Sequence, residues 1–137
     1  MADPVADIAF WFDPVCPFAW MTSKWVRQVQ AERRYSVEWR PISLRLMNAH
    51  IDYDSHFPPD YEAGHTAGLR LLRLVEAVRE VHGSDGVDAL QQALGLALFE
   101  VDRADIVKPV EARGETPFAE RCLAEAGLPT DLAGAVA

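Results

Sequence analysis

The chain of 137 residues is poor in cysteine and in basic residues. Its two cysteines, Cys16 and Cys122, lie far apart in the sequence, and a structural disulfide between them is not expected in a reducing cytosol. Only 13 lysine and arginine residues stand against 21 aspartate and glutamate residues, which gives a net charge of -8. Nucleic acids and anionic membranes require a concentrated positive surface, so this balance argues against both classes of partner.

Long apolar runs and targeting signals are also missing. The longest stretch without a charged residue in a helical pattern, residues 89–99, is too short to cross a bilayer. The segment Met1–Asp7 carries two aspartates and a proline. It has no basic start followed by an apolar stretch, and no export signal is predicted. We therefore expect a cytoplasmic protein that does not bind membranes.

The first forty residues contain the patterns of two strands joined by a helix. Residues 8–12, an aromatic run that ends before Asp13, are typical of a buried strand. Pro17 suits the first position of a helix that continues to about Arg34, and residues 37–41 are expected to form a second strand. This order predicts a parallel βαβ unit. The residues expected on the buried face of the helix are Phe18, Thr22, Trp25, Val26 and Val29.

The rest of the chain is expected to be helical. Residues 48–60 are polar and are interpreted as a linker. The helices predicted after this linker cover residues 59–82, 85–100 and 116–127, with a short turn from residue 128 onwards. We expect residues 1–47, with the βαβ unit, and residues 48–137, with the helices, to form one domain.

Cys16 carries the predicted chemistry. It lies between the first strand and the helix, directly before Pro17. A thiol at a helix N-terminus faces the positive end of the macrodipole and several unpaired backbone N–H groups, and both favour thiolate over thiol. Thiolate is the form that attacks disulfides and other electrophiles. Cys16 is therefore the predicted catalytic nucleophile.

The segment around this cysteine resembles a known family. Residues 10–25 read FWFDPVCPFAWMTSKW. This string is similar to the DsbA-like branch of the thioredoxin superfamily. It is closest to the mycothiol-dependent nitroreductase group, whose members read FWFDPxCPxCWxTSxW, and the likeness continues to AGLP at residues 126–129. The resemblance implies a thioredoxin-like α/β fold with an all-helical insertion, an oxidoreductase activity, and no metal. It also implies mycothiol or another low-molecular-weight thiol as cofactor, and a small electrophilic or disulfide substrate.

By this resemblance Cys16 matches the nucleophile of the family, but Ala19 stands where dithiol members carry a resolving cysteine. A monothiol route is then expected, in which a small thiol caps Cys16 and a second thiol molecule releases it. Trp20 follows in the first turn beside Cys16, and two interpretations of it stay open: a core residue, or the exposed wall of a flat apolar site. The expected substrate- and thiol-binding residues are Asp13, Pro14, Pro17, Phe18 and Trp20.

The family completes its sheet with strands that follow the helical insertion, together with a cis-proline loop opposite the cysteine. No segment after Gly127 is predicted to form such strands. The string GETP at residues 114–117 is similar to the loop, but the residues after it continue as a helix. We therefore expect a shortened chain in which the C-terminal strands are missing. An uncovered sheet promotes self-association, and a homodimer is one expected form.

Other candidate residues have simpler interpretations. Cys122 is expected to be a small core residue, the four tryptophans are mostly assigned to the core, and His65 and His82 to surface or capping positions. Four residues alternate in the linker and would share one side of an extended segment, where they could hold zinc. A solvated linker is favoured for these four, which are His50, Asp52, Asp54 and His56.

Two alternatives to the thiol oxidoreductase stay open. The first is an enzyme that resembles kappa-class glutathione transferase or 2-hydroxychromene-2-carboxylate isomerase, relatives that often carry serine where Cys16 stands. The second is a binding module without catalysis, which Ala19 and the missing strands would favour.

Overall fold

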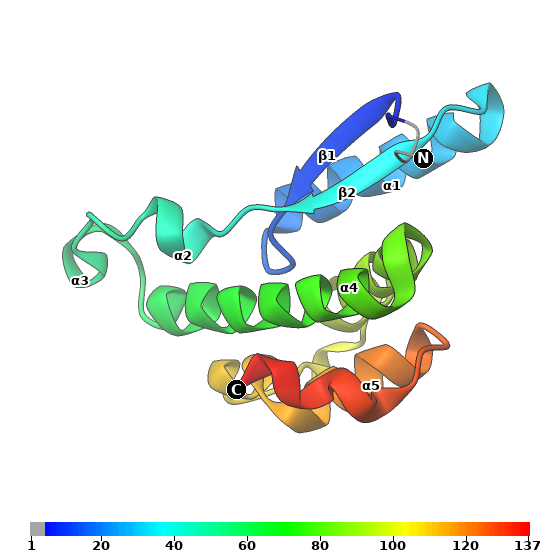
Figure 1. The fold of residues 1–137 in the computed structure, drawn as a ribbon. Helices are drawn as coiled ribbons and strands as arrows, with labels where there is room; N and C mark the ends of the chain where they lie inside the picture. The colour runs from blue at the N-terminus through cyan, green and yellow to red at the C-terminus, as the bar shows by residue number, and fades with distance from the viewer. Residues whose placement is uncertain (1–4) are drawn as a thin grey trace.

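A computed structural model describes residues 5–137. The absence of an export signal is predicted from Met1–Asp7, and the first four of these residues lie outside the described part of the chain. The described chain is mixed α/β and mostly helical (Figure 1). Its elements are β1 (Ile8–Phe12), α1 (Pro17–Arg33), β2 (Val37–Pro41), α2 (Leu44–Met47), α3 (Tyr53–His56), α4 (Tyr61–Phe99), the 3-10 turns η1 (Arg103–Asp105) and η2 (Val110–Gly114), α5 (Thr116–Glu125) and the 3-10 turn η3 (Thr130–Val136).

The predicted parallel βαβ unit is confirmed. β1 and β2 form a two-stranded parallel sheet in which Ile8 lies opposite Val37 and Phe12 lies opposite Pro41. α4 packs against β2, and Phe12 and Trp39 are buried in the same hydrophobic cluster as side chains of α4. One face of the sheet is therefore covered by the helices. The assignment of the unit to the thioredoxin fold stays a prediction.

The buried face of α1 differs from the prediction. Phe18 is 78% exposed and Trp25 is 63% exposed, whereas the buried residues of the helix are Trp20, Ser23 and Val26. Ser23 tolerates burial because its hydroxyl donates a hydrogen bond of 2.7 Å to the carbonyl oxygen of Trp20. The predicted face is therefore correct for Val26, which is 5% exposed, and wrong for Phe18 and Trp25.

α1 is attached to the second half of α4 by specific contacts. The Trp20 ring lies against Gly95, and its Nε1 donates a hydrogen bond of 2.9 Å to Glu100 Oε1. Further along α1, the Arg27 guanidinium contacts Asp88 and donates a hydrogen bond of 2.7 Å to Gln91. These contacts fix the helix that begins next to Cys16.

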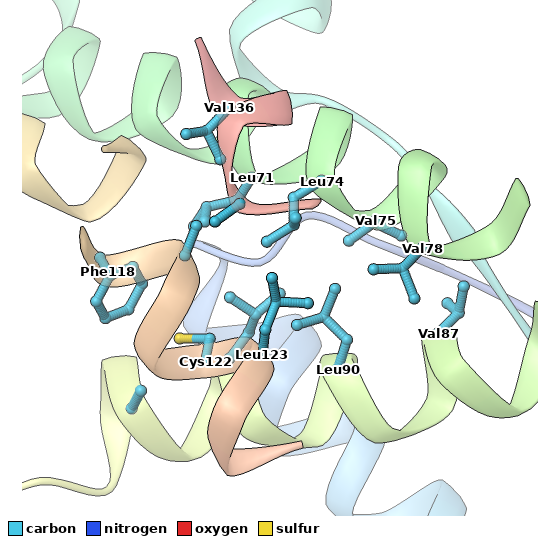
Figure 2. Packing of buried hydrophobic residues seen from close by; sticks show 14 of the residues in the cluster. Leu71, Leu74, Val75, Val78, Val87, Leu90, Phe118, Cys122, Leu123 and Val136 are labelled. Carbon is cyan, nitrogen blue, oxygen red and sulfur yellow. The ribbon is translucent and has the colours of Figure 1, made fainter. Parts of the chain in front are cut away.

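α4 consists of two helical segments that meet at Gly83. This glycine has φ 70° and ψ -165°, which is outside the helical range, so the predicted end of a helix at this position is confirmed. Figure 2 shows Leu74 and Val78 of the first segment (residues 61–82) facing Leu90 of the second segment (residues 84–99) across the core. The two segments fold back on each other, and the chain reversal depends on one residue.

The core lies between the two segments of α4 and the C-terminal elements. Figure 1 shows β1, β2 and α1 on one side of α4 and α5 on the opposite side. Phe118, Cys122 and Leu123 of α5 and Val136 of η3 are buried in the same cluster as the leucines and valines of α4. The predicted helix from Thr116 is confirmed, and Pro117 lies in its first turn, not in a strand-connecting loop.

The predicted linker is more ordered than the sequence suggested. α2 precedes it, and within it the short helix α3 is capped by Asp52, whose side chain accepts a hydrogen bond from the Asp54 backbone N–H. Because Asp54 and His56 lie in this helical turn, the linker does not present its acidic and histidine side chains as one extended row. No helix of the described chain is long and apolar enough to cross a membrane.

Replacing Gly83 with alanine should destabilise the protein by about 2 kcal/mol. A Cβ at this position would meet open space, so the cost comes from forcing an L-residue into a conformation that is nearly exclusive to glycine. Urea unfolding monitored by tryptophan fluorescence measures the change. The matched control is Gly134→Ala, where the Cβ also meets open space and φ is not in the left-handed range. An equally small change in both variants would contradict the hinge role of Gly83.

Candidate functional site

Cys16 is the N-cap residue of α1, as predicted. Its backbone is extended (φ -85°, ψ 112°), and its side chain makes no capping hydrogen bond. Its carbonyl oxygen accepts the first helical hydrogen bond, of 3.1 Å, from Trp20 N–H. Cys16 is a free thiol of intermediate exposure. The thiol is thus available at the positive end of a 17-residue helix. Its catalytic role stays a prediction.

Asp13 holds the loop that presents this cysteine. Its side chain is buried, at 3% exposure. Oδ1 accepts a hydrogen bond of 3.0 Å from Val15 N–H, and Oδ2 accepts one of 2.8 Å from Leu44 N–H at the start of α2. Burial raises the pKa of Asp13, and the two backbone hydrogen bonds act in the opposite direction. This geometry supports a role for Asp13 in orienting the loop before α1.

α4 approaches the same loop closely at Gly68. A Cβ on Gly68 would lie only 2.6 Å from Asp13 Oδ1 and 2.7 Å from Val15 Cγ2. Only glycine allows the helix to pack so tightly against the residues that precede Cys16. His65 lies one turn earlier on α4, so this contact also brings an imidazole to the cysteine side of the helix.

Cys16 and His65 line one pocket of about 480 Å³. The pocket is formed by the loop before α1, by α2, by the start of α4 and by η2, and most of its lining is apolar. Its polar lining groups include the Asn48 amide, the Asp60 carboxylate and the Arg113 guanidinium. The remaining lining residues are Val15, Pro17, Phe18, Leu44, Phe57, Pro59, Tyr61, Gly64 and Val110. A cleft of this volume with few polar groups is typical of small-molecule sites.

His65 is the residue that sequence reasoning missed. Its isolated position on a helix predicts a surface or capping residue, but His65 is half-buried and its Nδ1 lies 2.9 Å from the Tyr53 hydroxyl. The rings of Tyr53, Phe57 and Tyr61 all contact the imidazole, with centroids between 5.6 and 5.9 Å away. Burial lowers the pKa of His65, the Asp13 carboxylate acts against this effect, and Arg45 adds to it. His65 is therefore neutral at about pH 7.

The other predicted site residues separate into two groups. Pro17 and Phe18 line the pocket shared by Cys16 and His65. Pro14 is buried in the loop before Cys16. Of the two interpretations of Trp20, the core residue is correct: the side chain is 6% exposed, because its ring fills the space over Gly95. Trp11 and Trp25 are exposed, so the assignment of the tryptophans to the core is correct only for Trp20 and Trp39.

Cys122 is a core residue, as predicted. Its side chain is fully buried in α5 (0% exposed), and both cysteines are free thiols. Burial raises the pKa of the Cys122 thiol to about 12, with Glu125 acting in the same direction. Cys122 is therefore poorly suited to resolve a disulfide on Cys16.

The two thiols should differ sharply toward an alkylating reagent. With a pKa of about 12, only about one Cys122 thiol in ten thousand is ionised at about pH 8. Native protein treated with iodoacetamide should gain one group, on Cys16, whereas protein unfolded in guanidinium chloride should gain two. Peptide mass mapping distinguishes the positions. Equal labelling of both cysteines in the native state would show that the core is open at α5.

Comparison with known proteins places the chain in a family. Residues 15–137 match the Rv2466c-like family, described as mycothiol-dependent nitroreductase Rv2466c. The chain is also 46% identical over 41 residues to the uncharacterized protein Rv2286c of Mycobacterium tuberculosis (strain ATCC 25618 / H37Rv). That alignment covers 30% of this chain and 18% of the relative.

The family match covers most of the chain, including Cys16, His65 and the other residues that line the pocket. The resemblance seen in residues 10–25 is therefore confirmed at the level of the family. The family description indicates an oxidoreductase that depends on a low-molecular-weight thiol. The chain belongs to the Rv2466c-like family of mycothiol-dependent nitroreductases.

Proposed function

We propose that the protein is a thioredoxin-like, monothiol oxidoreductase in which Cys16 reduces small electrophilic or disulfide substrates with mycothiol or another low-molecular-weight thiol. The single observation that carries this proposal is the free, half-buried Cys16 thiol at the N-terminus of α1, which lines an apolar pocket of about 480 Å³. The family match supports the thiol dependence. A cytoplasmic location, where such thiols are abundant, is part of the same proposal.

The proposed reaction with a disulfide has two steps. The Cys16 thiolate attacks one sulfur of the substrate, the S–S bond of the substrate breaks, and the leaving thiolate takes a proton from water. Cys16 is then joined to the retained half in a mixed disulfide. A second thiol attacks the retained half, the bond to Cys16 breaks, and Cys16 leaves with the electron pair as thiolate. The product is a new small disulfide, and the proton of the attacking thiol goes to solvent.

The second step needs an external thiol because the chain offers no second accessible cysteine that could attack the mixed disulfide on Cys16. Ala19 occupies the position of the resolving cysteine, and Cys122 is buried with a raised pKa. We infer that a small thiol from solution completes each turnover by releasing Cys16 from its mixed disulfide.

The binding residues have distinct proposed roles. Asp13 and Pro14 position the loop, since Asp13 ties it to α2 through backbone hydrogen bonds. Pro17 starts α1, and Phe18 offers an exposed aromatic face to the substrate. Trp20 acts indirectly by anchoring α1 to α4. The apolar walls suit a flat, weakly polar substrate, and Asn48 and Arg113 can donate hydrogen bonds to its polar substituents.

The test is a reductase assay on the purified chain. We expect turnover of a small disulfide, such as bis(2-hydroxyethyl) disulfide, in the presence of mycothiol, with a rate that depends on the thiol concentration. Glutathione in place of mycothiol measures thiol selectivity. No turnover above the uncatalysed rate with any small thiol would contradict the proposal.

The alternative of a thiol transferase is favoured by one observation, the absence of a resolving thiol beside Cys16. A transferase joins the small thiol to the electrophile as a thioether and leaves no disulfide. Mass analysis of the products therefore separates the two activities. A stable thioether as the main product would show that the protein is a transferase and not an oxidoreductase.

A further inference from the structure

We propose that His65 is the general base that activates the second thiol, the one that releases Cys16 from its mixed disulfide. This inference rests on the proposed monothiol function. It assigns to His65 a step that an internal resolving cysteine would otherwise perform, because Ala19 and the buried Cys122 leave that step to a thiol from solution.

The placement of His65 is the first argument. The imidazole and Cys16 line the same pocket although they lie 49 positions apart in the sequence. Gly68 allows α4 to pack directly on the loop before Cys16, and His65 lies one turn away on the same helix. A thiol that enters the pocket to reach a group bound to Cys16 therefore shares this pocket with the imidazole.

The orientation of the ring is the second argument. Nδ1 is engaged by the Tyr53 hydroxyl at 2.9 Å, and the stacked rings of Phe57 and Tyr61 also contact the imidazole. Proton exchange with a ligand therefore falls to Nε2. The contact with Tyr53 allows the tautomer in which Nδ1–H donates to the phenol oxygen and Nε2 carries the lone pair that a base requires.

The charges around the ring are the third argument. Burial keeps His65 neutral at about pH 7, and Tyr53 stays protonated because burial also raises the pKa of its hydroxyl. The Asp13 carboxylate favours the imidazolium that forms when His65 takes a proton. The charged or titratable groups that act on the ring or share its pocket are Asp13, Cys16, Arg45, Tyr53, Asp60, Tyr61 and Arg113.

The release step exchanges the disulfide bond to Cys16 for a disulfide bond between two small groups. Nε2 of His65 takes the proton of the incoming thiol, and the thiolate so formed attacks the sulfur of the group bound to Cys16. The disulfide bond to Cys16 breaks, Cys16 leaves as thiolate with the electron pair, and a disulfide forms between the two small groups. The imidazolium then returns its proton to water. Alkyl thiols are only a few per cent ionised at about pH 7, so a base has a large effect on this step.

The experiment isolates this half-reaction. Protein with Cys16 joined to 2-mercaptoethanol is mixed with an excess of 2-mercaptoethanol and quenched in acid, and intact mass gives the fraction of free protein. If the thiol attacks the Cys16 sulfur, the same adduct forms again and the mass does not change. The assay therefore records only attack on the outer sulfur, which releases Cys16. The variants are His65→Gln and His65→Met, so that one remains informative if the other does not fold. The control is His56→Gln, an exposed histidine outside the pocket.

At about pH 7 we expect release to be about tenfold slower in both His65 variants and unchanged in the control. At about pH 10 the attacking thiol is largely ionised, so the difference from the unmodified protein should disappear. If the His65 variants release Cys16 as fast as the unmodified protein at about pH 7, the role of His65 is overturned and the monothiol function stays intact. The same conclusion holds if the variants are slower by the same factor at about pH 7 and at about pH 10. Failure of Cys16 to accept the adduct would overturn the function itself.

Discussion

Replacement of Cys16 with serine should abolish thiol-dependent reductase activity, with a loss of at least about a thousandfold. A serine hydroxyl is not ionised at neutral pH and forms no mixed disulfide, so neither step of the proposed cycle can occur. The fold should remain, because Cys16 is the N-cap of α1 and makes no capping hydrogen bond with its side chain. Serine is among the preferred residues at that position. Initial rates with mycothiol and a small disulfide measure the loss.

Two controls make this result specific. Circular dichroism and thermal unfolding should show that Cys16→Ser folds like the unmodified protein. Cys122→Ala, which removes the other thiol, should keep the reductase activity while losing some stability, because its side chain is fully buried in α5. If Cys16→Ser keeps its activity and Cys122→Ala loses it, the nucleophile has been assigned to the wrong cysteine.

Replacement of Gly95 with alanine should lower the free energy of unfolding by about 3 kcal/mol. A Cβ on Gly95 would lie 1.9 Å from Trp20 Cε3 and 2.1 Å from Cζ3. The ring cannot retreat freely, because its Nε1 is hydrogen-bonded to Glu100. Alanine is favoured over glycine inside a helix by about 1 kcal/mol, so the clash must exceed that gain. Urea unfolding followed by tryptophan fluorescence gives the net change.

The same substitution should also lower the reductase activity, since Trp20 lies in the first turns of α1 and Cys16 precedes that helix. Gly134→Ala is the matched control: its Cβ meets open space, and we expect a change within about 0.5 kcal/mol and full activity. A stabilised Gly95→Ala variant would mean that the contact between Trp20 and α4 is looser than described.

Local patterns in the sequence were sufficient for the two strands and the longer helices, but not for the short helix α3 within the predicted linker. The aromatic run before Asp13, Pro17 at the start of α1 and Gly83 between the two segments of α4 each act through short-range backbone preferences. The position of Cys16 at a helix N-terminus follows from the same kind of signal. These features could therefore be predicted without knowledge of tertiary contacts.

The buried face of α1 could be predicted only in part from α1 itself, since Val26 alone of its expected residues is buried. Phe18 and Trp25 have the spacing of an apolar stripe, yet both are exposed. Trp20 is buried because Gly95, far along the chain, leaves room for its ring. Which aromatic residue is buried is thus decided by a glycine on another helix, and no pattern within residues 17–33 contains that information.

His65 was missed for a similar reason. A single histidine in a helix has no local signature of function, and its partners Tyr53 and Asp13 come from α3 and from the loop after β1. The signal that was present is Gly68, one turn further along α4. A glycine inside a helical pattern often marks a close approach between elements, and here it marks the contact that places His65 in the pocket of Cys16.

The most direct measurement is to trap the covalent enzyme during turnover. The protein is mixed with mycothiol and a small disulfide, and samples are quenched in acid at times shorter than one turnover. Peptide mass mapping then locates the adduct. We expect a mixed disulfide on Cys16 that forms at least as fast as product and decays in proportion to the thiol concentration. Turnover without an adduct on Cys16, or with an adduct on Cys122 alone, would contradict the account.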